Sequence, residues 1–420
     1  MNAQRGTHTM TNKVLVVGGG VAGLSAASEL ADLGMDVDIV ERSEFAGGHA
    51  IRYACKATDR CVKCGACMVE DRLGRVVGHP KIRLMTGTRV QDVSRSKDFC
   101  VTLVKKPLFI DAGKCSNCGI CFDKCPEEGA VLKGFSRNHT PLYAISGETC
   151  RYVKDRSCTL CGEACPEGAI DLDAVEMRES VRADAVILAT GFAPFDPVDK
   201  PYGYGRFKNV VTNLEMEDIL RREGRAIKPS GDAEPDSIAF IQCVGSRDAK
   251  RGHLWCSKVC CGSALRMANL VKTRRPETRI TFFYMDVQSF GRDFDDFYAG
   301  IRKKLRWIRA IPGDIYPAGD ERLRVTYLDN ASSETLQEEF DLVVLSVGMT
   351  PGRDLQQTAG TLELRLAQTG FVEQVSEGSP TSEKGVFPAG AVSGPMSIPE
   401  SIARAGEAVF EVLKYLDSSC

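Results

Sequence analysis

The stretch KVLVVGGGVAGL, residues 13–24, decides the fold of this chain. Its first part, 13–17, is a continuous apolar run that is typical of a buried parallel strand. Glycines follow, and an Ala- and Leu-rich segment over about 21–33 then predicts a helix that ends at Gly34. A second apolar run at 37–40 predicts the next strand. The order strand, helix, strand predicts an α/β fold that begins with a dinucleotide-binding lobe.

The glycines are spaced as in a nucleotide-binding turn, since Gly18, Gly20 and Gly23 match G-x-G-x-x-G directly after the strand. The first permits a tight turn, the second lets the backbone approach a pyrophosphate, and the third packs the helix on the strand. The helix N-terminus adds free N–H groups and the positive end of a dipole. Glu41, at the end of the second strand, is placed to accept from a ribose hydroxyl. We also assign Val21, Ala22 and Arg42 to this site.

Further turns favour FAD over NAD as the bound nucleotide. Gly47 and Gly48 follow Glu41 closely, where a second close approach to the pyrophosphate is needed. These turns resemble the linked motifs of the glutathione and thioredoxin reductase superfamily of flavoproteins. That superfamily usually has an Asp after its last glycine, and Ala391 stands there in this chain. The other residues assigned to the flavin site are Ala189, Thr190, Gly191, Gly390, Ala391 and Ile398.

The composition excludes several classes of function. The chain has 420 residues, of which 43% are hydrophobic, so two or three domains with a sizeable core are expected. Its 54 basic and 56 acidic residues give a net charge of −2, which leaves no electrostatic footprint for nucleic acid or a membrane surface. No apolar run approaches the roughly 20 residues that span a bilayer, and the N-terminus lacks the apolar region of a secretory signal. We therefore expect a cytoplasmic protein.

The 18 cysteines of a cytoplasmic chain indicate metal binding or redox chemistry rather than disulfides. The strongest pattern is a pair of runs, 115–126 and 150–166, that each end in C-x3-C-P. In two-cluster ferredoxins the last cysteine of each run binds the other cluster. Zinc also uses C-x2-C pairs, but it does not need that ending twice. We assign one [4Fe–4S] cluster to Cys115, Cys118, Cys121 and Cys165, and a second to Cys125, Cys150, Cys158 and Cys161.

Two more groups of cysteines predict further clusters. Cys243, Cys256, Cys260 and Cys261 follow a second apolar strand, where the second lobe of a reductase would carry its own glycine fingerprint. Gly245 remains of that fingerprint, so we expect a cluster in place of a pyridine nucleotide; buried free thiols are the alternative. Cys55, Cys61, Cys64 and Cys67 predict a fourth cluster, with a zinc knuckle or partly free thiols as alternatives. Cys100 and Cys420 lie outside all groups.

These patterns predict an interleaved domain order. A FAD-binding lobe is expected at 12–108, 173–232 and 349–420, with an inserted ferredoxin-type domain of two clusters at 109–172. A second Rossmann-like lobe that carries a cluster is expected at 233–348. Within the first lobe, VRADAVILATG at 181–191 predicts one strand that runs into a glycine turn.

Together, the motifs resemble the heterodisulfide reductase family, in particular its flavin-binding A chain and the bacterial relatives of that chain. The resemblance is carried by VVGGGVAGL at 16–24, the 115–165 insert, CVGSRD at 243–248, CSKVCC at 256–261 and GPMSIPESIA at 394–403. It implies that the 243–261 cysteines hold a cluster close to the flavin. Full-length members have an extra N-terminal domain and a C-terminal ferredoxin domain, so we expect a trimmed form. A lysine near the flavin in those members corresponds here to Arg266, our flavin-proximal candidate.

The resemblance implies an electron-transfer subunit that relays electrons between FAD and the clusters, and it leaves flavin-based bifurcation open. The implied partners are similar to the B and C chains of heterodisulfide reductase, to ferredoxins or to acyl-coenzyme A reductases. Related trimmed subunits occur in sulfur-oxidation, quinone-linked and class II benzoyl-coenzyme A reductase complexes. Two other functions stay open. One is a self-contained NAD(P)H-dependent reductase, which would need a second nucleotide fingerprint, and the other is a zinc-stapled interaction scaffold.

Overall fold

The first lobe is built on a five-stranded parallel sheet. The computed structural model describes residues 12–139, 141–288, 294–374 and 381–418. The strand order is β20 (Val386–Pro388), β9 (Ala185–Leu188), β1 (Lys13–Val17), β2 (Asp36–Val40) and β3 (Ile82–Met85). The apolar run at 13–17 therefore forms the central strand, as predicted, because its side chains are buried on both faces of the sheet.

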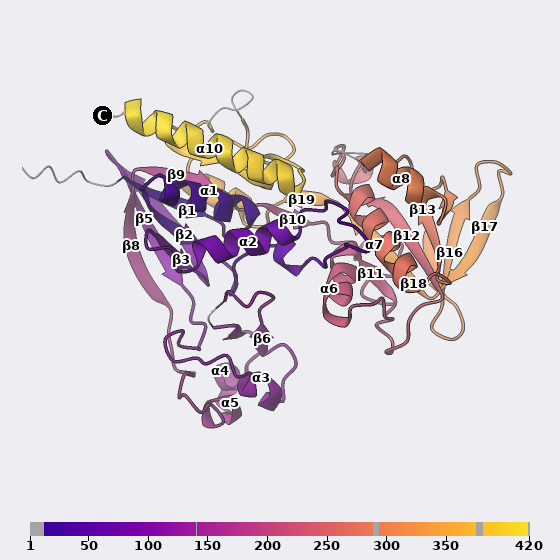
Figure 1. Cartoon of the computed structure of the whole chain (residues 1–420), viewed down its shortest axis with the longest axis horizontal. Coiled ribbons are helices and arrows are strands. Elements are labelled where there is room, and N and C mark those ends of the chain that lie inside the picture. The colour runs from indigo at the N-terminus through magenta and orange to yellow at the C-terminus, as the bar shows by residue number, and fades with distance from the viewer. Residues whose placement is uncertain (1–11, 140, 289–293, 375–380, 419–420) are drawn as a thin grey trace, which may run out of the picture.

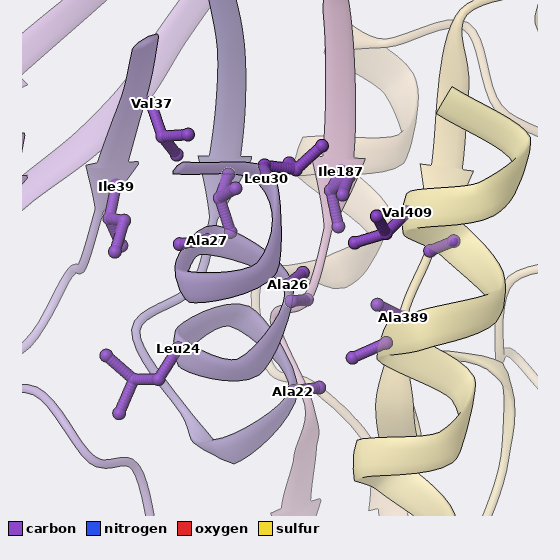
Figure 2. Close-up of a cluster of buried hydrophobic side chains, with 14 of the residues drawn as sticks. Ala22, Leu24, Ala26, Ala27, Leu30, Val37, Ile39, Ile187, Ala389 and Val409 are labelled. Carbon is purple, nitrogen blue, oxygen red and sulfur yellow. The ribbon is translucent and has the colours of Figure 1, made fainter. Parts of the chain in front are cut away.

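Helices α1 (Val21–Asp32) and α10 (Ile398–Ser418) lie side by side against this sheet. Figure 2 shows Leu30 of α1 between the sheet residues Val37 and Ile187, with Val409 of α10 next to Ile187. Helix α2 (Cys67–Val76) packs against α1. These helices cover one face of the sheet and exclude water from it, so the turn after β1 is attached to a packed core.

A three-stranded antiparallel sheet lies next to the parallel sheet, in the order β4 (Thr88–Arg95), β5 (Phe99–Lys105) and β8 (Met177–Ala183). The prediction of one strand over 181–191 is wrong, because the chain changes sheets at Asp184. The carboxylate of Asp184 accepts from the backbone N–H of Lys13 at 2.7 Å, which fixes this corner.

The segment between β5 and β8, residues 106–176, forms a separate body below the first lobe in Figure 1, and we call it the insert. Lys105 pairs with Met177, so the chain leaves and re-enters the sheet at neighbouring positions. The insert has its own core, which includes Phe109, Val131, Tyr143 and Ile145. Its elements are α3 (Ile120–Lys124), β6 (Val131–Lys133), β7 (Tyr143–Ile145), α4 (Arg151–Asp155) and α5 (Leu160–Glu163).

The second lobe has a five-stranded parallel sheet of its own, beside the first lobe in Figure 1. Its order is β11 (Val210–Thr212), β18 (Leu342–Val347), β12 (Ser237–Val244), β13 (Arg279–Phe283) and β14 (Arg306–Ile308). Helices α6 (Asn213–Glu223), α7 (Cys260–Arg274) and α8 (Phe294–Arg302) pack on it, and β15 (Asp314–Pro317), β16 (Leu323–Leu328) and β17 (Thr335–Phe340) form a small antiparallel sheet.

The boundary predicted at 232/233 between the lobes is wrong. Strand β11 pairs with β18 in the second sheet, and α6 packs with it, so this part of the chain belongs to the second lobe. The strands β10 (Phe192–Pro194) and β19 (Met349–Pro351) pair with each other. They form a two-stranded link between the lobes, at the points where the chain enters and leaves the second lobe. The apolar signal of β11 is too short, at three residues, to be recognised without its partner strand.

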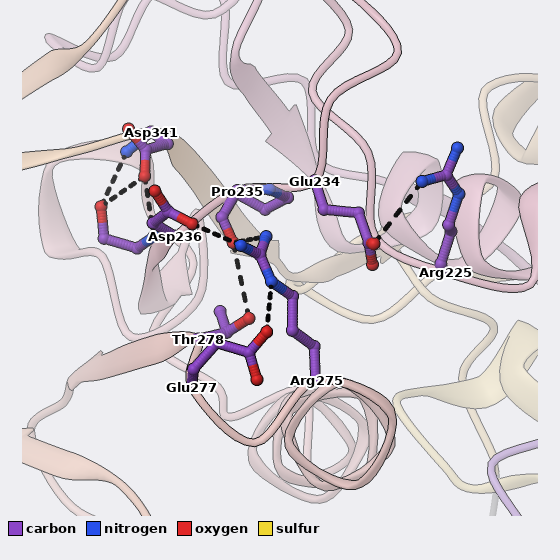
Figure 3. A network of polar contacts seen from close by, with 9 residues as sticks. Arg225, Glu234, Pro235, Asp236, Arg275, Glu277, Thr278 and Asp341 are labelled. Carbon is purple, nitrogen blue, oxygen red and sulfur yellow. Dashed lines mark hydrogen bonds and ion pairs between the residues drawn. The ribbon is translucent and has the colours of Figure 1, made fainter.

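An ion-pair network closes the end of the second lobe where β12 and β13 begin (Figure 3). Arg275, at the end of α7, pairs with Asp236 and Glu277 and donates to the carbonyl oxygen of Pro235. Asp341 accepts from the backbone N–H and the hydroxyl of Ser237, each at 2.8 Å. The cysteine-bearing ends of β12 and α7 lie at the opposite end of these elements.

Among the described residues, no helix combines the length and the apolar character that crossing a membrane requires.

Candidate functional site

The glycine turn after β1 is shaped by contacts that no larger residue would allow. Gly18 has a φ of +112°, and a Cβ there would lie 2.3 Å from the carbonyl oxygen of Ala189. A Cβ at Gly23 would lie 1.9 Å from the carbonyl oxygen of Gly18. These glycines bring the β1 turn, the end of β9 and the start of α1 into direct contact, as the fingerprint requires.

A second glycine turn faces the first across a narrow gap. A Cβ at Gly48 would lie 3.1 Å from the Cα of Gly20, whereas a Cβ at Gly20 would meet nothing closer than 4.0 Å. The backbone N–H of Gly47 donates to the carbonyl oxygen of Gly19 at 2.7 Å. Gly20 is also the N-cap of α1 and supplies no side-chain cap, so the first N–H groups of α1, from Val21 onward, are available to an anion.

The C-terminal turn packs on the same helix end. Gly390 has a φ of +72°, and a Cβ there would lie 2.6 Å from the Cβ of Ala22. Ala391 follows in a short 3-10 helix, and α10 then begins at Ile398. The structure therefore brings the three sequence-distant glycine motifs together around the N-terminus of α1.

Glu41 is buried at the end of β2 and already holds the glycine turn. Its Oε2 accepts from the N–H of Gly19 and its Oε1 from the N–H of Ser43, both at 2.7 Å. A carboxylate accepts about four hydrogen bonds, so capacity remains for a ribose hydroxyl. Arg42 is exposed and forms an ion pair with Asp354, so in this structure its side chain lies at the protein surface.

Thr190 supplies an independent test of the flavin assignment. Its Oγ1 is buried and has no hydrogen-bond partner among the described residues. A buried hydroxyl normally has a hydrogen-bond partner, so an unpartnered one indicates that a bound molecule supplies the partner. Gly191 beside it has a φ of +69° and open space at its Cβ position. The glycine cradle and this unpartnered hydroxyl fit a dinucleotide such as FAD.

The insert contains two pockets, each lined by four cysteines. One is lined by Cys115, Cys118, Cys121 and Cys165, together with Tyr143 and Ile170. The other is lined by Cys125, Cys150, Cys158 and Cys161. The structure thus groups these cysteines in the crossed sets that the sequence predicts, with Cys165 next to the first run and Cys125 next to the second.

One thiol in each pocket, Cys121 and Cys161, lies in surroundings that disfavour the free thiolate. Burial raises the pKa of Cys121 to about 11, and Cys115 and Cys118 act in the same direction. Burial also raises the pKa of Cys161 to about 11, with Cys150 and Cys125 adding to the effect. Bound iron would neutralise the repulsion between neighbouring thiolates, because thiolates are its ligands.

The loop at 61–67 has the backbone conformation of the loop at 115–121. Both sequences read C-x-x-C-G-x-C, as CVKCGAC and CSNCGIC. The third residue is left-handed in each, with φ of 49° at Lys63 and 58° at Asn117. The fifth is also left-handed in each, with φ of 78° at Gly65 and 83° at Gly119. A helix begins within the last two residues of each loop, α2 at Cys67 and α3 at Ile120.

The cysteines of the second lobe gather where β12 ends and α7 begins. Cys243 has a φ of 60° and lies in a register shift of the β12–β18 pairing, a bulge that turns its side chain out of the sheet pattern. Burial raises the pKa of Cys243 to about 12, with Cys261 and Cys256 adding to it. Cys260 and Cys261 are both buried in the first turn of α7. The α7 N-terminus, where a second nucleotide would sit, is therefore occupied by thiols.

The cysteines of the described residues are free thiols, and Cys420 lies outside that part of the chain. No three His, Cys, Asp or Glu side chains of the described residues converge closely enough to hold a single metal ion. A cluster spreads its ligands around a cube instead of around one ion, so the four-cysteine pockets are the relevant measure of its fit.

The segment that carries the 55–67 cysteines crosses from the first lobe to the second. Ala54 packs in the core of the second lobe, and the N–H of Ala54 donates to Glu217 of α6 at 3.1 Å. Lys56 forms a buried ion pair with the same carboxylate. At the far end of the segment, a Cβ at Gly65 would lie 3.2 Å from the Cγ2 of Ile398. The 55–67 cysteines therefore lie beside the start of α10 and against the second lobe.

Sequence reasoning missed Lys56 and Glu217, because their roles depend on a contact between lobes that no local pattern records. Lys258, which flanks the second-lobe cysteines in the sequence, pairs with Glu400 near the start of α10 at 3.6 Å and so links these cysteines to the first lobe. Arg266 points at the 61–67 loop, where its Nε donates to the carbonyl oxygen of Val62 at 2.9 Å.

The fold is that of the two-lobed thioredoxin reductases. The thioredoxin reductase of T. acidophilum aligns with 97% of this chain and 100% of its own, with a TM-score of 0.56 and 15% identity. That of Lactococcus lactis gives a TM-score of 0.56 at 14% identity, over 97% of this chain and 100% of its own. A family model described as an NAD(P)-binding Rossmann-like domain matches residues 16–70. The chain is thus a two-lobed dinucleotide-binding α/β protein with cysteine-rich additions.

Curated relatives match this chain over nearly all of its length. The A chain of the H(2):CoB-CoM heterodisulfide,ferredoxin reductase of Methanothermobacter thermautotrophicus is 33% identical over 95% of this chain and 63% of its own length. The iron–sulfur A chain of the CoB–CoM heterodisulfide reductase of Methanocaldococcus jannaschii is 34% identical over 93% of this chain and 62% of its own. Over nearly all of its own length the chain is similar to these heterodisulfide reductase A chains, and it spans less than two thirds of the length of these relatives.

Proposed function

We propose that this chain is an electron-transfer subunit of a larger oxidoreductase, with FAD in the first lobe and iron–sulfur clusters in the insert and between the lobes. The observation that carries the proposal is the pair of crossed four-cysteine pockets in the insert. Each pocket takes three cysteines from one stretch and a fourth from the other, which is the arrangement of a two-cluster ferredoxin.

The chemistry of the flavin would be to connect two-electron with one-electron transfer, and the clusters would carry single electrons. The chain's own residues supply the setting for both. The glycine turns at Gly20 and Gly48 let the backbone approach a pyrophosphate, and the free N–H groups at the start of α1 face its charge. Buried cysteines hold their clusters in low-dielectric surroundings, which tunes their potentials.

Two further clusters extend the proposal. Burial raises the pKa of Cys243 and of Cys260, and the neighbouring thiols of Cys256 and Cys261 raise it further, which supports one cluster at the N-terminus of α7. The matching conformations of the 61–67 and 115–121 loops support another at Cys61, Cys64 and Cys67, for which Cys55 is our proposed fourth ligand. Both groups of cysteines lie near the start of α10, because Lys258 pairs with Glu400 and Gly65 lies close to Ile398. They would therefore link the flavin to partner subunits.

The partners are proposed from the names of the relatives, which are subunits of heterodisulfide and ferredoxin reductases. We propose that this chain likewise acts in the cytoplasm within a complex, and that a different subunit holds the terminal substrate. Electron bifurcation at the flavin is the finer form of this proposal. Cys118 of the insert is exposed, so the first cluster pocket reaches the surface where a partner can exchange electrons.

The test is anaerobic purification of the full chain, followed by assays of flavin, iron and acid-labile sulfide. We expect one FAD and roughly 12 to 16 iron atoms per chain, matched by sulfide, for three or four clusters. Zinc without iron would leave the interaction scaffold as the function. Prompt bleaching of the flavin by NADH or NADPH would instead support a self-contained reductase. It would contradict our interpretation that thiols occupy the N-terminus of α7, where a second nucleotide would bind.

A further inference from the structure

Arg266 spans the contact between the second lobe and the 61–67 loop of the first. It lies on α7, five positions after Cys261. Its Nε donates to the carbonyl oxygen of Val62 at 2.9 Å, which places the guanidinium beside the peptide between Val62 and Lys63, inside the loop. A side chain from one lobe thus fixes the main chain of a cysteine loop in the other.

Aromatic rings of α8 hold the guanidinium in place. The Cζ of Arg266 lies 5.6 Å from the ring centroid of Phe294 and 5.5 Å from that of Phe297. A Cβ at Gly262 would lie 2.7 Å from Nη1 of Arg266, so the glycine leaves room for the side chain on the surface of α7. Cation–π contacts and this close packing restrict the rotamers of a long side chain, which gives the charge a defined position.

The acidic side chains that act on Arg266 are the thiols of Cys64 and Cys61 rather than carboxylates. No carboxylate of the described residues forms an ion pair with Arg266. Burial lowers the pKa of the guanidinium, whereas Cys64 and Cys61 act in the opposite direction. A half-buried cation without a carboxylate is unfavourable unless another negative group lies beside it. Cysteine thiolates on a cluster supply such a group.

We propose that Arg266 is a positioning residue for the 61–67 loop and raises the reduction potential of the cluster that this loop holds. The inference rests on the fourth cluster of the proposed function. Reduction adds one electron to the cluster, and the guanidinium keeps its proton throughout. A fixed positive charge favours the more negative, reduced form of a neighbouring centre, so it raises the potential.

The experiment uses the full chain with its cofactors and measures cluster midpoint potentials by anaerobic titration with electron paramagnetic resonance. Cys64→Ser first identifies which signal belongs to the 61–67 loop. In Arg266→Gln we expect that signal to shift to lower potential while the other cluster signals keep their potentials and the iron content stays close to the wild-type value. Arg266→Lys keeps the charge without the planar donor fork, so its shift should be smaller.

Arg221→Gln is the matched control. Arg221 also donates to a backbone carbonyl oxygen, that of Tyr53 at 3.0 Å, and lies 5.8 Å from the ring centroid of Phe135. Unchanged potentials in Arg266→Gln, or the same shift in Arg221→Gln, would overturn the inference. So would a Cys64→Ser variant that keeps all of its iron, since the loop would then hold no cluster. In each of these cases, FAD and the insert clusters would still uphold the proposed electron-transfer function.

Discussion

Lys56 and Glu217 form an ion pair across the boundary between the lobes, with Nζ 2.7 Å from Oε1 and side chains that are 3% and 2% exposed. Glu217 also accepts from the N–H of Ala54 and from the hydroxyl of Ser263. Burial raises the pKa of Glu217, and Lys56 acts in the opposite direction. The pair therefore anchors the cysteine-bearing segment of the first lobe in the second lobe, provided that both charges are present.

Removing one member of this pair should destabilise the protein strongly. Lys56→Met or Glu217→Gln leaves a buried group without its partner, and we expect a loss of about 3–5 kcal/mol in the free energy of unfolding. The double substitution Lys56→Met with Glu217→Met should lose less than either single one, because no charge is then stranded. Denaturant unfolding of the purified holoprotein measures both.

The surface pair of Lys81 and Asp36 is the control for this prediction, since its side chains are 36% and 46% exposed. Lys81→Met should change the free energy of unfolding by roughly 0–1 kcal/mol, as is usual for exposed pairs. Equal effects at Lys56 and Lys81 would contradict the anchoring role of the buried pair.

Paired cysteine substitutions should reveal which thiols share a cluster. Cys115 and Cys165 line one pocket, and Cys125 lines the other. Each single Cys→Ser change should remove about four iron atoms. Cys115→Ser with Cys165→Ser should remove no more than one of them alone, whereas Cys125→Ser with Cys165→Ser should remove about eight. Iron and sulfide analysis decides, and additive loss for the 115/165 pair would contradict the crossed assignment.

Gly20 and Gly18 should respond differently to alanine. At Gly20 a methyl group fits the protein, with its nearest neighbour 4.0 Å away, but it projects into the gap that faces Gly48. We expect Gly20→Ala to fold and to bind FAD roughly tenfold more weakly, a loss of about 1.4 kcal/mol. Gly18→Ala should disrupt folding itself, since its Cβ would meet the Ala189 carbonyl at 2.3 Å. Circular dichroism and bound flavin separate the two effects, and full flavin content in Gly20→Ala would contradict the cradle.

Cluster loading should become more favourable as the pH rises. The pKa is raised to about 12 for Cys243 and to about 11 for Cys121 and Cys161, so these thiols are protonated near neutral pH in the iron-free protein. Each must lose its proton to bind iron, and the released protons make binding stronger at higher pH. Reconstitution of iron-free protein should give more iron per chain at about pH 8.5 than at about pH 7. The reverse order, measured by iron assay on correctly folded protein, would show that other groups control loading.

How far the sequence predicted the fold depended on the length of each signal. The runs at 13–17 and 21–33 became β1 and α1, because a long apolar pattern is stable only where a buried strand or a helix that covers the sheet can bury it. At 181–191 the same apolar pattern concealed a change of sheet at Asp184. Val181 and Ala183 are buried before that corner and Ala185 to Leu188 after it, so the apolar residues continue through the change of sheet.

The sequence by itself determined the glycine turn and the cysteine groups, because both depend on short spacings along the chain that fix local backbone geometry. Only the tertiary structure decided which distant parts meet. The pairing of Lys56 with Glu217, the approach of Gly65 to Ile398 and the reach of Arg266 to Val62 all join the two lobes. Such contacts arise from the packing of whole sheets and helices, and the residues that make them carry no pattern of their own until the lobes are brought together.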